Sequence, residues 1–93
     1  MIKVFLHPRF IRELRKLSEA EKESIQAALS SVMQDFGNPH QHGGIGLRKL
    51  GNKAWECRIG IDRRIVFERS DEGLVAFGIM NHDQVRTWVR NLK

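Results

Sequence analysis

The sequence lacks the features of secreted, membrane-spanning and repetitive proteins. Its 93 residues contain one cysteine, two prolines and no tyrosine. A single cysteine excludes an internal disulfide, as is typical of proteins in reducing compartments. No apolar run approaches the roughly 20 residues of a transmembrane helix, and the apolar stretch at the N-terminus is too short for a signal peptide. We therefore expect one cytoplasmic domain, residues 1–93, that makes no contact with a membrane.

Motifs of several common chemistries are also missing. His40 and His42 form a His-x-His pair, but no third ligand stands at a suitable spacing, so no metal site is predicted. The segment GGIG, residues 43–46, lacks the glycine spacing and the Lys-Ser/Thr pair of a phosphate-binding loop. Cys57 lies in an apolar alternation, which favours a buried thiol over a reactive one. We expect no metal and no organic cofactor.

Acidic residues are too few to balance the basic ones. The net charge is +5 at pH 7, and from Arg48 onward Lys and Arg outnumber Asp and Glu by 10 to 6, against 6 to 5 before it. The excess is therefore regional. It favours a polyanionic partner, either a nucleic acid or an acidic protein segment, over a protein that is merely basic.

Hydrophobic periodicity predicts three helices. The first begins at Pro8, a residue that suits the first helical turn, and has apolar residues on one face at positions 10, 11, 14 and 17. Ser18 and Glu21 form a capping box that opens a second helix, which ends at Gly37. The third helix covers residues 81–93 and has apolar residues at positions 85, 88, 89 and 92.

Strand patterns surround a helical hairpin. Residues 2–6 form one strand, residues 37–46 are a long flexible stretch, and three or four strands with short connections follow between residues 47 and 80. The order β-α-α-β-β-β-α predicts an α+β fold. The N-terminal strand and the αα-hairpin pack on a 3–4-stranded antiparallel sheet, and a C-terminal helix follows. The other face of the sheet is then only partly covered, and a site can lie there.

Arginines mark that second face. Alternation places Trp55, Cys57, Ile59 and Ile61 toward the core. Arg58 then points the other way, and in a hairpin Arg64 joins it on the neighbouring strand if the register allows. Two adjacent guanidinium groups need solvent, a carboxylate such as Glu56 or Glu68, or a ligand phosphate, which the planar arginine fork matches.

His82 is the second candidate. It stands at the start of the last helix, at the border between the apolar stripe and Arg86. A histidine in that position can act as a general acid or base near neutral pH. Asp83 either orients it or stabilises the helix N-terminus. An incidental histidine in a capping segment is the alternative.

The combination of these segments resembles the RelE/ParE superfamily of toxins from bacterial and archaeal toxin–antitoxin pairs. The segments are HPRFIRELRKL, LRKL, WECRI, RRIVF and NHDQVRTWV, and the resemblance covers nearly the whole chain. It implies a metal-independent endoribonuclease that cuts mRNA, usually on the ribosome, by attack of a 2′-hydroxyl on the adjacent phosphate. It also implies a cognate antitoxin that covers the basic face with an acidic segment.

The resemblance also assigns roles. Arg64 and Arg58 would stabilise the charge of the phosphorane, and His82, oriented by Asp83, would be the general acid or base. The residues expected to bind RNA are Arg48, Lys49, Arg63, Arg86 and His42.

One departure keeps other functions open. Relatives often carry an aromatic residue, frequently tyrosine, where this chain has Arg86, so a tyrosinate base is excluded. The superfamily also contains toxins of the ParE type, which inhibit DNA gyrase without cutting RNA. A third hypothesis is a basic module without toxicity that only binds a protein or DNA.

Overall fold

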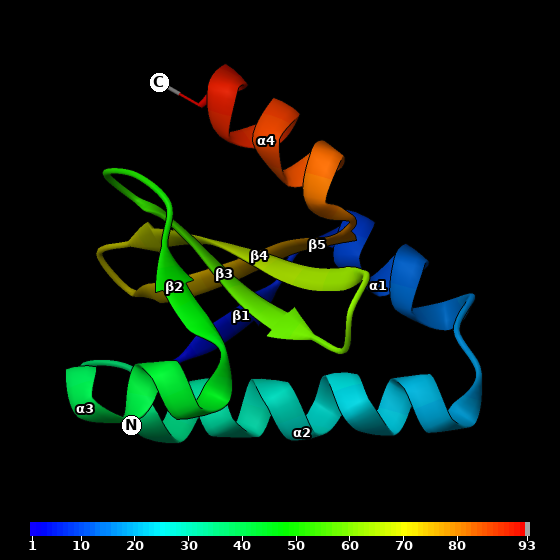
Figure 1. Cartoon of the computed structure of the whole chain (residues 1–93), viewed down its shortest axis with the longest axis horizontal. Coiled ribbons are helices and arrows are strands. Elements are labelled where there is room, and N and C mark those ends of the chain that lie inside the picture. Colours follow the sequence, from blue (N-terminus) through cyan, green and yellow to red (C-terminus); the bar gives the residue numbers. More distant parts are fainter. Residues whose placement is uncertain (93) are drawn as a thin grey trace.

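The computed structural model, which describes residues 1–92, is organised around a five-stranded sheet in the order β1-β5-β4-β3-β2 (Figure 1). Strands β2 (Leu47–Lys49), β3 (Ala54–Ile59), β4 (Arg63–Ser70) and β5 (Gly73–Met80) form an antiparallel meander. Strand β1 (Val4–Leu6) pairs in parallel with β5 at the edge. The predicted antiparallel sheet is confirmed, with the N-terminal strand as an additional parallel member.

Helices α1 (Pro8–Arg15) and α2 (Glu19–Asp35) cover one face of this sheet. Both bonds of the predicted capping box form, because Ser18 Oγ accepts from Glu21 N at 3.2 Å and the Glu21 carboxylate accepts from Ser18 N at 2.9 Å. The main core lies between these helices and the sheet. Its buried residues are Phe10, Ile25, Val32, Leu47, Cys57, Ile65, Phe67, Leu74 and Ala76.

Helix α4 (His82–Asn91) lies above the opposite face, as Figure 1 shows. Asn81 and Gln84 cap its N-terminus reciprocally, so the predicted start is confirmed. Val85, with Trp88 and Val89 beside it, packs on Val66 and Met80 of the sheet. This second core is small, and α4 therefore leaves part of the sheet face open. The final residue of the predicted helix, Lys93, lies outside the described residues.

Two local predictions are wrong. Residues 37–46 were expected to be a flexible stretch, but they contain a short helix α3 (Pro39–His42) and a 3₁₀ turn η1 (Gly43–Ile45). Ile61 was expected in the core, but it is 90% exposed. The hairpin between β3 and β4 turns at residues 60–62, so Ile61 lies at the tip of a turn where alternation no longer applies. No helix within residues 1–92 is both long enough and apolar enough to cross a bilayer.

Gly73 fixes the parallel edge of the sheet. Its φ is +151°, and a Cβ at this position would lie 2.3 Å from the carbonyl oxygen of Lys3. That carbonyl accepts the hydrogen bond from Leu74 N that begins the pairing of β1 with β5. A side chain at Gly73 is therefore incompatible with this strand pairing as it stands.

We predict that Gly73→Ala lowers the free energy of unfolding by about 2 kcal/mol or more, because the backbone of β1 must move away. Urea denaturation at neutral pH measures the change. Gly51→Ala is the matched control, since a Cβ there meets nothing within 4 Å, and it should shift stability by less than about 0.5 kcal/mol. Equal effects of the two variants would contradict the assigned role of Gly73.

Candidate active site

A buried carboxylate lies at the centre of the sheet face under α4. Glu56 stands on β3 opposite Arg48 of β2 and Val66 of β4, and its side chain is only 7% exposed. Glu56 Oε2 is 3.1 Å from Nη2 of Arg48, and Oε1 is 3.2 Å from Nε of Arg64. A buried carboxylate is costly without such partners. Glu56 therefore joins three neighbouring strands through two charged contacts.

The two arginines of the hairpin face each other across the strands but are not equivalent. Arg58 and Arg64 are direct partners in the register of β3 and β4, as the hairpin pattern predicted. Arg64 is compensated by Glu56, and its side chain is 13% exposed. Its buried Nε lies within ion-pair distance of Glu56 but has no hydrogen-bond acceptor among the described residues, because the groups are not aligned. Arg58 is exposed and forms no ion pair within residues 1–92.

Glu56 and His82 line the same cavity, which has a volume of about 280 Å³. Strands β2 and β3 provide Arg48 and Glu56, and the loop after β2 provides Leu50. Helix α4 provides the remaining wall, with His82, Val85, Arg86, Val89 and Arg90. A carboxylate and an imidazole thus share one solvent-connected space with three guanidinium groups. Arg58 and Arg64 are not part of this lining.

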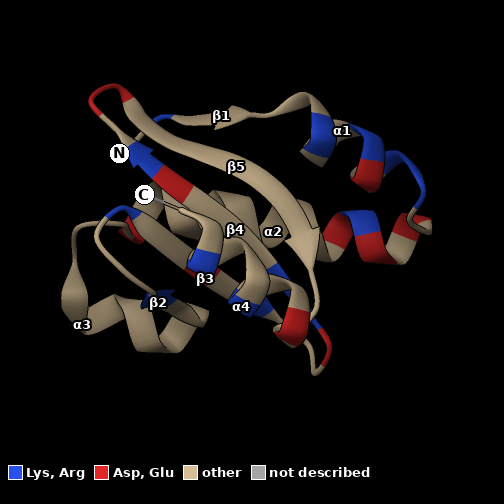
Figure 2. Cartoon of the chain, turned by 90° about the horizontal axis from the view of Figure 1, so that it is seen from above, with Lys and Arg blue, Asp and Glu red and all other residues tan. Residues whose placement is uncertain are grey.

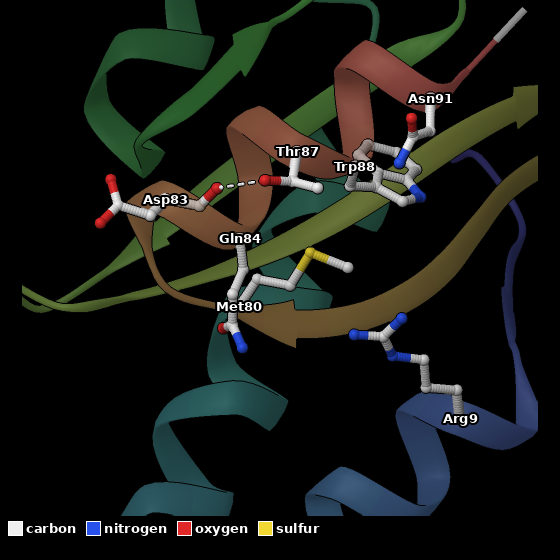
Figure 3. A pocket seen from close by; sticks show the side chains of 7 residues that line it. All are labelled: Arg9, Met80, Asp83, Gln84, Thr87, Trp88 and Asn91. Carbon is white, nitrogen blue, oxygen red and sulfur yellow. Dashed lines mark hydrogen bonds between the residues drawn. The ribbon is translucent and has the colours of Figure 1, made fainter.

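Helix α4 separates this cavity from a second one on its other side. The second cavity, of about 400 Å³, is lined by Asp83, Gln84, Thr87, Trp88 and Asn91 of α4 together with Met80 and Arg9 (Figure 3). Asp83 therefore lines this second cavity and not the cavity of His82, and no hydrogen bond joins the two side chains within the described residues. The structure does not bring the predicted pair of His82 and Asp83 to one cavity.

Three residues expected to bind RNA lie elsewhere. Lys49 shares the phase of buried Leu47 on β2, so it is on the other face of the sheet from Arg48. Arg63 forms an ion pair with Glu21 of α2. His42 accepts a hydrogen bond from Gly37 N and packs against the rings of Phe36 and Trp55. None of these three residues is part of the lining of the Glu56 cavity.

Other candidate chemistries find no support in the geometry. Burial, and then the charge of Glu56, raise the pKa of Cys57 to about 11, and the thiol donates to the carbonyl of Ile45. The inert thiol expected from the alternation fits this environment. Among residues 1–92, no three His, Cys, Asp or Glu side chains gather closely enough to hold a metal ion.

Sequence reasoning missed two residues of the cavity. Glu56 was considered only as a counter-ion for an arginine, although alternation already placed it on the open face with Arg58. Arg90 was passed over, although it stands four residues after Arg86 and eight after His82 on the same helix. A helical spacing of four residues was the signal that could have identified it.

Comparison with solved structures identifies the fold. The chain is similar to the isolated RelE toxin of Escherichia coli, with 17% identity, a TM-score of 0.65, and coverage of 99% of this chain and 100% of that one. A chain of the RelE–RelB complex from Pyrococcus horikoshii aligns with a TM-score of 0.68 at 15% identity, over 86% of this chain and 93% of that one. YafQ of E. coli aligns with a TM-score of 0.65 at 8% identity, over 91% and 98%. No family model and no curated sequence matches the chain.

The chain therefore has a RelE-like toxin fold, which confirms the fold that the sequence motifs predicted. At these identities the likeness extends to the arrangement of helices and strands. The chemistry of this chain has to be argued from its own side chains.

The hydrogen bond from Ser18 and the ion pair with Arg63 make the free energy that Glu21 contributes to folding depend on pH. The backbone N–H of Ser18, and then Arg63, lower the pKa of Glu21 from its ordinary value of 4.5. A carboxyl group whose pKa is lower in the folded state stabilises the fold above its unfolded pKa, and this contribution is lost as the pH falls through the folded pKa. Glu21 therefore contributes fully at neutral pH, and the loss occurs below about pH 4.5.

We predict that Glu21→Gln, which retains an acceptor for the capping box, reduces the fall in melting temperature between pH 7 and pH 3. Thermal unfolding followed by circular dichroism at both pH values measures it. Glu23→Gln, an exposed change on the same helix, should leave the fall unchanged. If the melting temperature falls equally in the unaltered protein and in both variants, Glu21 does not contribute to the loss of stability in acid.

The two partners of Glu56 differ in energetic weight. Arg64 is nearly buried and keeps its charge at any accessible pH, whereas the Arg48 side chain is 68% exposed. Loss of the carboxylate leaves Arg64 without compensation. Loss of Arg48 leaves Glu56 still paired with Arg64.

We therefore expect Glu56→Gln to cost about 3 kcal/mol of unfolding free energy and Arg48→Gln less than about 1 kcal/mol. Chemical denaturation of both variants provides the comparison. Equal losses would mean that the buried pair of Glu56 and Arg64 does not dominate the stability of this face.

Proposed function

We propose that this chain is the toxin component of a toxin–antitoxin pair and acts as an endoribonuclease on mRNA by a mechanism that needs no metal. The observation that carries the proposal is the shared cavity of Glu56 and His82, flanked by Arg48, Arg86 and Arg90. The likeness of the fold to RelE and YafQ supports the toxin assignment. The regional excess of basic residues supports a polyanionic substrate.

The reaction requires a base and an acid on opposite sides of one phosphate. Glu56 removes the proton from a ribose 2′-hydroxyl, whose oxygen forms a bond to the adjacent phosphorus. The bond from phosphorus to the 5′-oxygen breaks, and protonated His82 gives its proton to that oxygen. The products are a 2′,3′-cyclic phosphate and a 5′-hydroxyl. A carboxylate base is available in the cavity although the chain has no tyrosine.

The arginines divide into two roles in this mechanism. Arg48, Arg86 and Arg90 line the cavity and supply positive charge to the reacting phosphate, where negative charge develops on the non-bridging oxygens of the phosphorane, and to the phosphate next to it. Arg64 contacts Glu56 and lies outside the lining, so it holds the carboxylate in position. Arg58, its exposed cross-strand partner, adds positive charge at the end of the same face.

The partners follow from the same surface. Two of the similar structures come from complexes of RelE with RelB, described as an antitoxin–toxin complex in the case of Methanococcus jannaschii. We infer a cognate antitoxin for this chain, whose acidic segment neutralises the basic face. The substrate is mRNA, and binding to the ribosome would present it as a single strand.

We predict that His82→Ala and Glu56→Gln each reduce RNA cleavage by about 10²-fold or more, because each removes one proton-transfer step. Purified protein is incubated with an mRNA and with translating ribosomes, and cleavage is measured by primer extension. Growth arrest on induction should be lost in parallel.

Matched controls are His40→Ala and Glu72→Gln, which change an exposed histidine and an exposed carboxylate far from the cavity. Both should retain cleavage. Circular dichroism at the assay temperature verifies that Glu56→Gln is folded. Undiminished cleavage by folded His82→Ala would refute the assignment, and inhibition of DNA supercoiling by gyrase without any RNA cleavage would replace it with the ParE-type function.

A further inference from the structure

One side of α4 carries a regular column of basic residues. His82, Arg86 and Arg90 recur every four positions, so each lies about 6 Å further along the helix and only about 40° around it. All three line the same cavity, and Arg48 faces them from β2. Figure 2, which looks down on the sheet from the α4 side, shows α4 lying across β3 and β4 with its basic segments in blue.

The positive charge of this column is not balanced by the protein. Within residues 1–92, neither Arg86 nor Arg90 forms an ion pair. Asp83, the acidic residue of α4, stands three positions before Arg86 and so is its neighbour on the helix, but it forms no ion pair within the described residues, and Figure 3 shows its carboxylate pointing away from Thr87 and Trp88. Glu56 contributes a carboxylate to the basic side, and two arginines already compensate it.

We propose that the column is a phosphate track, in which one RNA strand runs along α4 and places consecutive phosphates on Arg86 and Arg90. The assignment of RNA rests on the proposed function. Arg86 and Arg90 are about 6 Å apart along the helix axis, so neighbouring phosphates of one strand can each meet a different arginine.

The apolar lining of the cavity determines what kind of recognition the track gives. Leu50, Val85 and Val89 are the apolar residues of the lining, and among the described residues it includes no Phe, Tyr or Trp, so its aromatic ring is the imidazole of His82, which the proposed mechanism uses for proton transfer. Single-strand binders without sequence preference usually combine a basic groove with aromatic stacking. Because the lining includes no Phe, Tyr or Trp on which bases could stack, we expect binding along α4 to depend mainly on the phosphates and to fall steeply with salt.

The test measures binding, so it does not depend on cleavage. The probe is a fluorescent single-stranded oligonucleotide of mixed sequence with 2′-O-methyl groups throughout, which has no 2′-hydroxyl to attack. Anisotropy at several salt concentrations gives the slope of log K against log salt for the full chain and its variants. Each phosphate contact of a single strand contributes about 0.7 to this slope.

We expect Arg86→Gln and Arg90→Gln each to reduce the slope by about 0.7, and the double variant to reduce it by about 1.4. Arg15→Gln, an exposed change of the same charge at the end of α1, should leave the slope unchanged. Unchanged slopes for Arg86→Gln and Arg90→Gln would overturn the track. A second result would also overturn the track: Arg90→Gln weakens the binding of a polyglutamate peptide but leaves the binding of the oligonucleotide unchanged. The column would then bind an acidic protein segment.

Failure of the track and failure of the nuclease are separable. If the unaltered protein cleaves RNA but Arg90→Gln does not change the slope of log K against log salt, the nuclease proposal stands and the track is refuted. If the variants show reduced slopes but the unaltered protein cuts no RNA, the track stands and the nuclease proposal is refuted.

Discussion

The buried carboxylate of Glu56 is the constraint on which the open face of the sheet depends. Two guanidinium groups, Arg48 and Arg64, approach it from the neighbouring strands within 3.1 and 3.2 Å. Burial makes such a charge expensive, and only close partners compensate it. The contacts therefore hold three strands in a common register around one acid. The same acid forms part of a cavity that is open to solvent, so a group needed for the stability of the face is also available for chemistry.

Helix α4 gives that face two different sides. Its apolar residues, led by Val85, attach it to the sheet along a narrow stripe. A helix attached in this way presents one flank on each side of the stripe. In this chain one cavity is lined by His82, Arg86 and Arg90 of α4, and the other by Asp83, Gln84, Thr87 and Asn91. The fold thus gives a helix of ten residues two separate cavities, and the basic side chains of this helix line one of them.

Local features of the fold could be predicted from the sequence, and contacts between distant segments could not. The capping boxes at Ser18 and Asn81 involve residues three positions apart, so the pattern is sufficient to find them. The pairing of Arg58 with Arg64 follows from a short hairpin. In contrast, the contact between Arg63 and Glu21 spans 42 positions, and the parallel pairing of β1 with β5 joins the two ends of the chain. Predicting that Glu56 is buried requires knowing where α4 lies, and the alternation of residues along β3 gives no information about that.

The absence of tyrosine has a consequence for selectivity once these elements are placed. An aromatic residue near the site would supply both a proton-transfer group and a surface on which a base stacks. Here Arg86 is part of the lining, and the apolar residues of the cavity, Leu50, Val85 and Val89, are aliphatic. Under the proposed function, Glu56 is the proton-transfer group, and the described lining includes no Phe, Tyr or Trp as a stacking surface. Binding energy then comes from phosphates, which are the same in every sequence. Selection of the cutting site must therefore come from outside this cavity, from whatever presents the strand.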